Sequence, residues 1–371
     1  MHLIVTRTFP PEVGGMQNLM YGLAKSLSEN VMIKVFADQY PNQNDFDKKL
    51  SFSIERVSGP KIFKKYRKAN LVNTYLENNQ KVKAIISDHW KSLENINTNV
   101  KKICLIHSKE INHKKDSFIN KRLIKILNSC HTVVANSNFT KNLAINVGVN
   151  QNIIKVINPG VFPVDKIDDK IYKSIKKTLE GKNPKLITVA RFDRRKNHEK
   201  IIMALRNLRE IYPNIIYICI GQGENIDNLK KLIKELKLQD HVIFPKNLIK
   251  DEKNSYLKCS DVFVMPSITY KKSVEGFGIV YVEAAQFGVP SIGGKDGGAS
   301  DAIEHEETGY ICDGNSLDDI YQSISNILEN NRYKVLGKKA EEVSKKFYWS
   351  EIIKKYLEIL KNYFFKNFFS T

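Results

Sequence analysis

Cysteine is sparse in this sequence of 371 residues, and long apolar runs are missing. The five cysteines are odd in number and widely scattered, and none forms a C-x-x-C pair. We therefore expect neither a disulfide framework nor a zinc cluster. No apolar stretch approaches the roughly 20 residues of a membrane-spanning helix, and the first residues lack the pattern of a secretory signal. These absences favour a cytoplasmic chain.

Negative charge is also scarce relative to positive charge. Lys and Arg number 59 against 40 Asp and Glu, which gives a net charge of +19. Residues 51–150 hold 18 of these cations and only 6 of the anions, a surplus of 12. Drift of the composition toward lysine explains part of this, but the uneven distribution predicts a basic face and an anionic partner.

Short apolar runs alternate with helical patterns, which predicts an α/β protein with two parallel-sheet, Rossmann-like domains. We expect an N-terminal domain over 1–165, a second domain over 166–345, and a C-terminal helical segment over 346–371 that crosses back to the first domain. The polar stretch 165–183 has no strand pattern and is interpreted as a linker. Ligands of such sheets bind at the carboxyl ends of the strands, here in a cleft between the domains.

Expected strands and helices follow this alternation. In the first half the expected strands are 2–6, 32–36, 84–87, 102–106 and 132–135, and the expected helices are 16–28 and 139–147. In the second half the expected strands are 186–190, 215–220, 241–244, 262–265, 290–293 and 310–312, and the expected helices are 224–236, 252–259, 317–347 and 350–365.

Two glycine turns lie between an expected strand and an expected helix. Glu275-Gly276-Phe277-Gly278 precedes a helix that contains Glu283, and Gly14 and Gly15 follow the first strand. A turn that opens a helix offers backbone N–H groups and the positive helix end to an anion. Either glutamate could bind sugar hydroxyls, although a solvated helix with two acids is the alternative, and a lone glycine pair is weak evidence.

Basic residues follow another strand. Arg191 and Lys196 lie in the loop after 186–190, where fixed cations could neutralise a diphosphate leaving group. Their neighbours Arg194 and Arg195 also fit an ordinary basic surface loop.

At this point the chain resembles the GT-B glycosyltransferases of family 4 (glycosyl transferases group 1), which are retaining enzymes that use nucleotide sugars. The resemblance covers nearly the whole length. It rests on Pro10–Gly15, Asn136–Thr140, Asn158–Val161, Ala190–Phe192 with Lys196-Asn197, Glu275–Ala285, Gly288–Pro290, Gly297-Gly298, Gly309-Tyr310 and Trp349. The fold it implies is GT-B, with two Rossmann-like domains facing each other across a cleft.

The resemblance assigns roles at the donor site. Arg191 and Lys196 would bind the donor diphosphate, Glu275 would hold hydroxyls of the donor sugar, and Glu283 would hold the ribose. Further donor contacts are implied for the backbone amides of Gly14, Gly15, Phe277 and Gly278. The leaving diphosphate would assist deprotonation of the acceptor, so no side-chain nucleophile is needed.

On the acceptor side, His107 matches a family histidine that faces the reacting sugar, although a histidine at a strand end is as often structural. Two details depart from the family pattern: Ser108 replaces a glycine, and the usual Asn-Gly-Val-Asp reads Asn158–Phe162. No metal and no cofactor is expected, and Asp45-Phe46-Asp47 is interpreted as a chance D-x-D match in a polar loop.

The basic surplus is centred on one segment of the N-terminal domain. On a helix, this segment would place an apolar stripe beside a cationic face, as in helices that lie in a membrane interface. An ordinary solvated helix is the alternative. The candidate membrane and acceptor residues are Lys61, Phe63, Lys64, Lys65, Tyr66, Arg67 and Lys68. The aromatic and basic tail 363–369 could also touch lipid or pack on the first domain.

We therefore expect a peripheral enzyme on the inner face of the cytoplasmic membrane that moves a hexose from a nucleotide sugar to a lipid. UDP-glucose or a related UDP-hexose or UDP-hexuronate is the favoured donor, and diacylglycerol is the favoured acceptor. Assembly of lipopolysaccharide, capsule or exopolysaccharide is the alternative. A nucleic-acid partner is not expected, because no base-reading motif accompanies the charge.

Overall fold

The computed structural model describes residues 1–361, apart from the side chain of residue 61. The chain divides into two compact units. Unit 1 comprises Met1–Phe162 together with the segment from Phe347 onward, and unit 2 comprises Pro163–Lys346.

Unit 1 contains a sheet of seven parallel strands in the order β3-β2-β1-β4-β5-β6-β7. The strands are β1 His2–Val5, β2 Ile33–Asp38, β3 Ser53–Val57, β4 Ala84–Ser87, β5 Lys101–Ile106, β6 Thr132–Ala135 and β7 Ile154–Val156. Strands β1 and β4 are buried along their whole length, as parallel strands are when helices cover both faces. Val5 pairs with Phe36 of β2 and with Ser87 of β4, so the loops after these three strands begin at one edge of the sheet.

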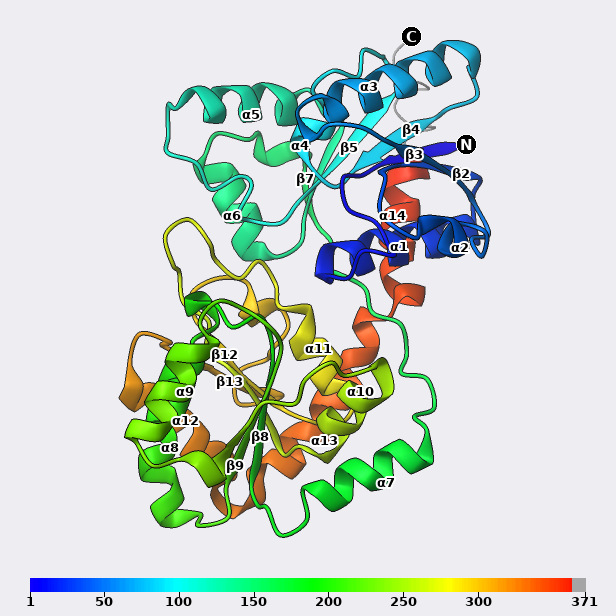
Figure 1. Ribbon diagram of the computed structural model, residues 1–371. Coiled ribbons are helices and arrows are strands. Elements are labelled where there is room, and N and C mark those ends of the chain that lie inside the picture. Colours follow the sequence, from blue (N-terminus) through cyan, green and yellow to red (C-terminus); the bar gives the residue numbers. More distant parts are fainter. Residues whose placement is uncertain (362–371) are drawn as a thin grey trace. The chain divides into compact units, whose positions relative to one another are not determined.

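Helices lie on both faces of this sheet (Figure 1). One face, which includes Ile4, is covered by α1 (Gly15–Ser28) and α14 (Trp349–Lys361). The opposite face, which includes Val5, is covered by α3 (Lys61–Asn78), α4 (Trp90–Leu93), α5 (Phe118–Asn128) and α6 (Asn138–Asn146). Ile4 and Val5 point to different faces because side chains alternate along a strand. The short helix α2 (Gln43–Asp47) follows β2.

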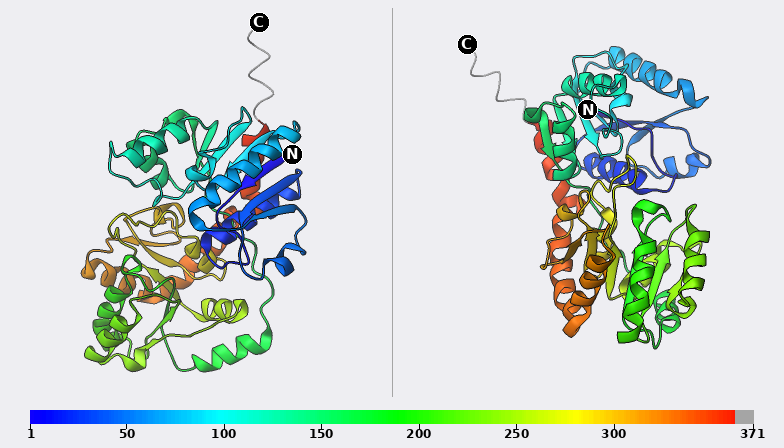
Figure 2. Two further views of the ribbon diagram at one scale, coloured as in Figure 1. Left: turned by 45° about the horizontal axis from the view of Figure 1, so that its top comes forward. Right: turned by 90° about the vertical axis from the view of Figure 1, so that its left-hand side faces the viewer.

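Unit 2 contains a sheet of six parallel strands in the order β10-β9-β8-β11-β12-β13. The strands are β8 Lys185–Val189, β9 Ile216–Ile220, β10 Val242–Ile243, β11 Val262–Met265, β12 Ser291–Gly294 and β13 Gly309–Cys312. One face is covered by α8 (His198–Ile211), α9 (Ile226–Glu235) and α12 (Leu317–Leu328), and the other by α7 (Asp169–Thr178), α10 (Lys250–Cys259) and α11 (Ile279–Ala285). Helix α13 (Arg332–Ser344) contacts α11 and α12. Figure 2 shows these helices around the strands from two further sides.

The predicted α/β class with two parallel-sheet domains is confirmed, whereas three local expectations are wrong. The presumed linker contains α7, whose Ile175 and Leu179 pack into the core of unit 2. Strands β3 and β7 were not expected. The helix expected over 317–347 is broken, because Asn330 and Asn331 adopt positive φ angles of 52° and 55°. The tail 363–369 lies outside the described residues.

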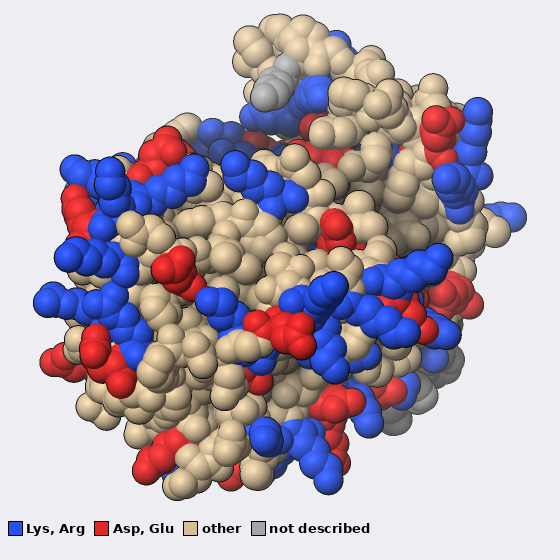
Figure 3. Space-filling model, turned by 60° about the horizontal axis from the view of Figure 1, so that its bottom comes forward, with Lys and Arg blue, Asp and Glu red and all other residues tan. Residues whose placement is uncertain are grey.

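Figure 3 shows one face of the molecule, on which Lys and Arg side chains lie among Asp and Glu side chains. On this face the basic side chains therefore do not form one uninterrupted patch.

Candidate active site

Two basic side chains of unit 2 converge on one carboxylate. The guanidinium Nη1 of Arg195 lies 2.8 Å from Oε2 of Glu275, and Nζ of Lys196 binds the same oxygen. Arg195 is 8% exposed and Lys196 is 9% exposed. Lys196 and Glu275 are thus brought together, as two candidates for one site must be. The surface-loop interpretation of Arg195 is wrong, because the loop turns this side chain inward toward Glu275.

The loop that carries these cations is fixed by its own polar residues. After β8 it forms a 3-10 turn, Arg194–Lys196, in which the Asp193 side chain accepts a hydrogen bond from the Lys196 N–H at 3.2 Å. Asn197 follows with a φ of 64°, and its side-chain amide donates to the carbonyl oxygens of Pro266 at 2.9 Å and Gly314 at 2.7 Å. The loops after β8, β11 and β13 are thereby tied together at the carboxyl ends of their strands.

Electrostatics keep Glu275 ionised. Burial by itself would raise the pKa of this carboxyl, but the Lys196 ammonium and the Arg195 guanidinium outweigh burial and lower the pKa to about 2. Burial also lowers the pKa of Lys196, and the Glu275 carboxylate offsets this only in part. The cluster is a desolvated ion triad in which one anion serves two cations.

A glycine turn lies directly after Glu275. Gly278 has a φ of 84°, and a Cβ atom there would meet the Tyr281 ring at 2.3 Å, so only glycine fits before α11 begins at Ile279. The Phe277 side chain is buried, at 2% exposed. The backbone carbonyl of Glu275 accepts from the Gly298 N–H at 2.9 Å. The predicted turn at the start of a helix is therefore present, and Glu275 lies directly before it.

Two other candidates of unit 2 form ion pairs of their own. The Arg191 side chain is 74% exposed and lies 3.5 Å from Asp193. The Glu283 carboxylate is bound by Lys253 of α10 at 3.0 Å. Both follow the same strand ends as the triad, and neither is part of it.

The unit 1 candidates follow β1 and β5. Helix α1 begins at Gly15 without a side-chain cap, and a Cβ atom on Gly15 would meet nothing within 4 Å. Gly15 is exposed, and the uncapped start of a helix is a position at which backbone N–H groups can bind an anion. His107 directly follows β5, and its backbone N–H binds the Glu110 carboxylate. Burial lowers the pKa of His107 to about 4, so this imidazole is neutral at physiological pH.

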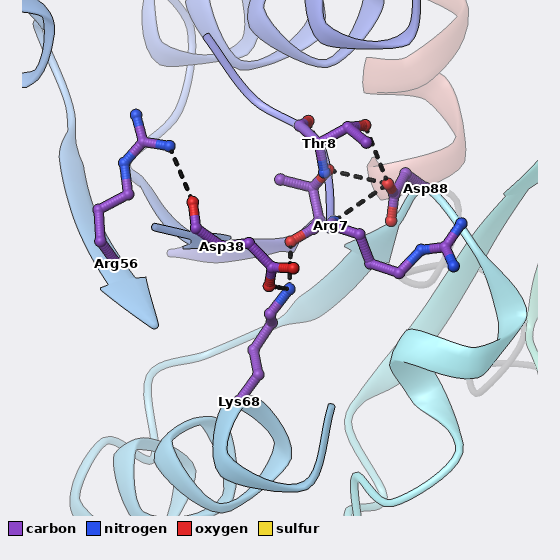
Figure 4. A network of polar contacts seen from close by, with 7 residues as sticks. Arg7, Thr8, Asp38, Arg56, Lys68 and Asp88 are labelled. Carbon is purple, nitrogen blue, oxygen red and sulfur yellow. Dashed lines mark hydrogen bonds and ion pairs between the residues drawn. The ribbon is translucent and has the colours of Figure 1, made fainter. Parts of the chain in front are cut away.

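Lys68 does not belong to the exposed basic face with which we grouped it. It is 3% exposed, and its ammonium binds the Asp38 carboxylate and the Thr6 carbonyl oxygen, the latter at 2.5 Å (Figure 4). Nearby, the Asp88 carboxylate accepts from the Thr6 hydroxyl at 2.9 Å and from the Arg7 N–H at 3.1 Å. Lys68 therefore fastens α3 to the ends of β1 and β2.

The remaining residues of that group lie on the first turns of α3. Phe63 and Tyr66 are exposed, at 57% and 47%, while Lys64, Lys65 and Arg67 are half-buried. The D-x-D segment Asp45-Phe46-Asp47 lies in helix α2 and not in a loop as expected. Its Asp47 forms an ion pair with Arg56 at 2.6 Å.

The sequence did not reveal that the Arg195 side chain points inward, or that the Asn197 side chain links neighbouring loops by hydrogen bonds. Arg195 stands next to Lys196 in the sequence, but adjacency in a loop does not reveal side-chain direction. Asn197 had a usable signal, because asparagine is the residue that most readily replaces glycine at a positive φ.

Chemically, the triad offers what a sugar diphosphate needs. It combines a buried ammonium, a buried guanidinium and a carboxylate that accepts hydrogen bonds, all beside a glycine turn at the carboxyl ends of the strands of a parallel sheet. Cations there can bind phosphate oxygens, and a carboxylate can hold hydroxyl groups.

Comparison with known proteins gives the family. Residues 13–163 match the model "Glycosyltransferase Family 4", and residues 170–345 match the model "Glycosyl transferases group 1". A GDP-mannose-dependent alpha-(1-6)-phosphatidylinositol monomannoside mannosyltransferase from Mycobacterium tuberculosis is 30% identical over 185 residues, which is 49% of this chain and 48% of that relative. The chain thus spans about half the length of this relative. The Mycolicibacterium smegmatis enzyme of the same name is 24% identical over 89% of this chain and 90% of its own.

Solved structures agree on the fold. HepE from Anabaena in complex with UDP superimposes with a TM-score of 0.82 at 18% identity, covering 97% of this chain and 99% of HepE. Sucrose-phosphate synthase from Thermosynechococcus elongatus superimposes with a TM-score of 0.79 at 19% identity, covering 96% of this chain and 98% of the synthase. With both halves matched by glycosyltransferase models and the fold shared with these neighbours, the chain belongs to the family 4 glycosyltransferases of the GT-B fold.

Proposed function

We propose that this glycosyltransferase moves a hexose from a nucleoside diphosphate sugar to a membrane lipid, with retention at the anomeric carbon. The observation that carries the donor half of the proposal is the triad of Arg195, Lys196 and Glu275 beside the turn at Gly278. A buried carboxylate with two cations suits a ligand that brings both hydroxyl groups and a diphosphate.

In this proposal, Arg191 and Lys196 bind the diphosphate and stabilise its departure. Glu275 holds hydroxyl groups of the sugar, and Glu283 holds the ribose. The departing diphosphate takes the acceptor proton on the face that it leaves, so the configuration is retained without a protein nucleophile. His107, neutral at physiological pH, faces the reacting sugar as a hydrogen-bonding group.

The reaction in this proposal uses no metal. Within residues 1–361, no three His, Cys, Asp or Glu side chains gather in an arrangement that could hold a metal ion. The charge of the leaving group is instead met by the side chains of Arg191 and Lys196.

The proposed donor is a UDP-hexose or GDP-mannose. The sequence favoured UDP-glucose, and HepE was solved with UDP, but the mycobacterial relatives at 30% and 24% identity are named for GDP-mannose. The same relatives are named for an inositol phospholipid acceptor, which supports a lipid acceptor and adds phosphatidylinositol to diacylglycerol as a substrate to test.

The acceptor half of the proposal is supported by one exposed apolar surface of unit 1, the aromatic surface. It consists of Ile62, Phe63 and Tyr66 on α3 and Phe118 and Ile119 on α5, which are between 41% and 75% exposed. No helix within residues 1–361 is long and apolar enough to cross a membrane. An interfacial surface of this kind would bring the enzyme to its lipid without crossing the bilayer.

The two halves of the aromatic surface are joined by charge. Glu94 binds Lys65 of α3 at 3.3 Å and Arg122 of α5 at 2.8 Å. The Lys65 ammonium in turn lies 4.6 Å from the Tyr66 ring centroid, and the Arg122 guanidinium lies 5.5 Å from the Phe118 ring centroid. A chain of contacts thus links the exposed aromatic rings and the cations of α3 to those of α5. Surfaces that carry such cations attract anionic lipid headgroups.

Vesicle binding tests the aromatic surface. Replacing Ile62, Phe63 and Phe118 together with Ser should reduce binding to vesicles that contain phosphatidylglycerol by about tenfold or more. The matched control replaces Ile211 and Val335, two exposed apolar residues of unit 2, with Ser and should leave binding unchanged. Equal binding by both variants would contradict membrane docking through this surface.

Release of nucleoside diphosphate tests the whole function. A panel of UDP-, GDP- and ADP-sugars is incubated with the enzyme, with and without micelles that contain diacylglycerol or phosphatidylinositol. Lipid-dependent release from one donor would support glycolipid synthesis and identify that donor. Release that responds only to saccharide acceptors would move the enzyme to lipopolysaccharide or polysaccharide assembly.

A further inference from the structure

One carboxylate oxygen of Glu275 is shared by two cations. Its Oε2 binds both the Arg195 guanidinium, at 2.8 Å, and the Lys196 ammonium. The two cations come from adjacent residues of one turn, and all three side chains are at most 13% exposed. For stability alone a buried carboxylate needs one well-placed cation, and a second buried cation adds a desolvation cost.

Binding of a donor would explain why Glu275 has two cations. In the proposed function, on which this inference rests, the Lys196 ammonium binds the diphosphate. In the structure, that ammonium binds Glu275 and lies 3.3 Å from the Met265 sulfur. If Glu275 had only Lys196, moving the ammonium to the phosphate would strand a buried carboxylate, which is strongly unfavourable.

We propose that Arg195 is a positioning residue that holds Glu275 in place as an anion, so that Lys196 is free to turn to the donor diphosphate. Arg195 is suited to this task because its guanidinium stays charged even when it is buried. Its own backbone is anchored, since its carbonyl oxygen accepts from the Ile268 N–H at 3.0 Å. Arg195 acts through Glu275 and Lys196 and does not touch the donor.

The proposal predicts a specific pattern of nucleotide affinities. In Arg195→Met, Glu275 has only Lys196, which stays with the carboxylate, and the Kd for a nucleoside diphosphate should rise about tenfold. Removing the anion as well should free Lys196 again. The double variant Arg195→Met/Glu275→Gln should therefore bind within about threefold of the wild type. UDP and GDP are the probes, because they carry the diphosphate and lack the sugar that Glu275 would hold.

Three further variants complete the experiment. Arg195→Lys keeps the charge and should restore most of the affinity that Arg195→Met loses. Glu275→Gln alone should bind the nucleotide at least as tightly as the wild type. Arg194→Met, a change to the exposed neighbour in the same turn, should leave the affinity unchanged.

Calorimetric titration of each folded variant separates the outcomes. Recovery of affinity in the double variant supports the inference, because a merely structural arginine would give a loss that Glu275→Gln cannot repair. Unchanged affinity in Arg195→Met, or a loss that persists in the double variant, overturns it. If Arg195→Met does not fold, weaker binding by Glu275→Gln alone overturns it. Should the wild type bind neither UDP nor GDP, the proposed function itself fails first.

Discussion

Among the described residues, each unit buries one lysine against a carboxylate at the carboxyl ends of its strands, and the two lysines differ in their other partner. Lys68 of unit 1 binds Asp38 and a carbonyl oxygen, that of Thr6. Lys196 of unit 2 binds Glu275 and the thioether sulfur of Met265. Burial lowers the pKa of both ammonium groups.

Under the proposed function, this difference separates a structural lysine from one that binds a ligand. An ammonium has three donors, and thioether sulfur is a weak acceptor. Lys68 therefore has two good oxygen partners inside the protein, whereas Lys196 has one and gains by finding an external anion. We infer that burial and ion pairing alone do not identify a functional lysine, and that the strength of its remaining acceptor does.

The largest expected effect comes from removing the carboxylate of the unit 2 triad. Glu275→Ala should lower the transfer rate by about a thousandfold or more, because the sugar loses its hydroxyl partner and the cations lose their anion. Initial rates with the donor found in the panel measure this, and circular dichroism checks the fold. Glu235→Ala, an exposed acid of α9, is the control and should retain full activity. Near-normal turnover in Glu275→Ala would contradict the site.

The next largest effect is a loss of stability when the structural lysine of unit 1 is replaced. Lys68→Met should lower the free energy of unfolding by about 2 kcal/mol, since it leaves the Asp38 carboxylate without its buried partner. The estimate is modest because the Asp38 side chain is 25% exposed and water can reach it. Urea unfolding gives the free energy. A variant as stable as the wild type would show that Lys68 is not the structural lysine of the pair.

The smallest effect concerns pH. The pKa of Glu275 is lowered to about 2 in the folded chain, from an ordinary 4.5, so its ionisation stabilises the fold above about pH 4.5, and this stabilisation is lost as the pH falls toward 2. The difference in unfolding free energy between wild type and Glu275→Gln should therefore shrink by about 1 kcal/mol between pH 7 and pH 3.5. Urea unfolding at both pH values measures it, and a difference that grows at low pH would contradict the ion triad.

Much of the fold and part of the site could be predicted from the sequence. The buried parallel strands read as continuous apolar runs, and the turn at Gly278 was visible because glycine marks a positive φ. Lys68 was misplaced because it follows a run of basic and aromatic residues of α3 that are exposed or half-buried, and only the packing of Ala69 and Val72 shows which face turns inward. Helix α7 was missed because its apolar residues stand four apart among lysines and its charge masked the periodicity.

The roles of Arg195 and Lys68 depend on tertiary contacts that sequence patterns do not contain. Arg195 meets Glu275 across 80 residues of sequence, and Lys68 meets the Thr6 carbonyl across 62. A pattern can place a cation in a loop or on a helix. Which anion it reaches depends on the packing of elements that are far apart in the chain.

The most direct test of the contrast is the affinity for UDP and GDP of wild type, Lys196→Ala and Lys68→Met, measured by calorimetric titration under identical conditions. We predict that Lys196→Ala binds the better nucleotide at least about tenfold more weakly, and that Lys68→Met stays within about twofold of the wild type. Unchanged binding by Lys196→Ala, or a loss confined to Lys68→Met, would contradict the assignment of the diphosphate site to unit 2.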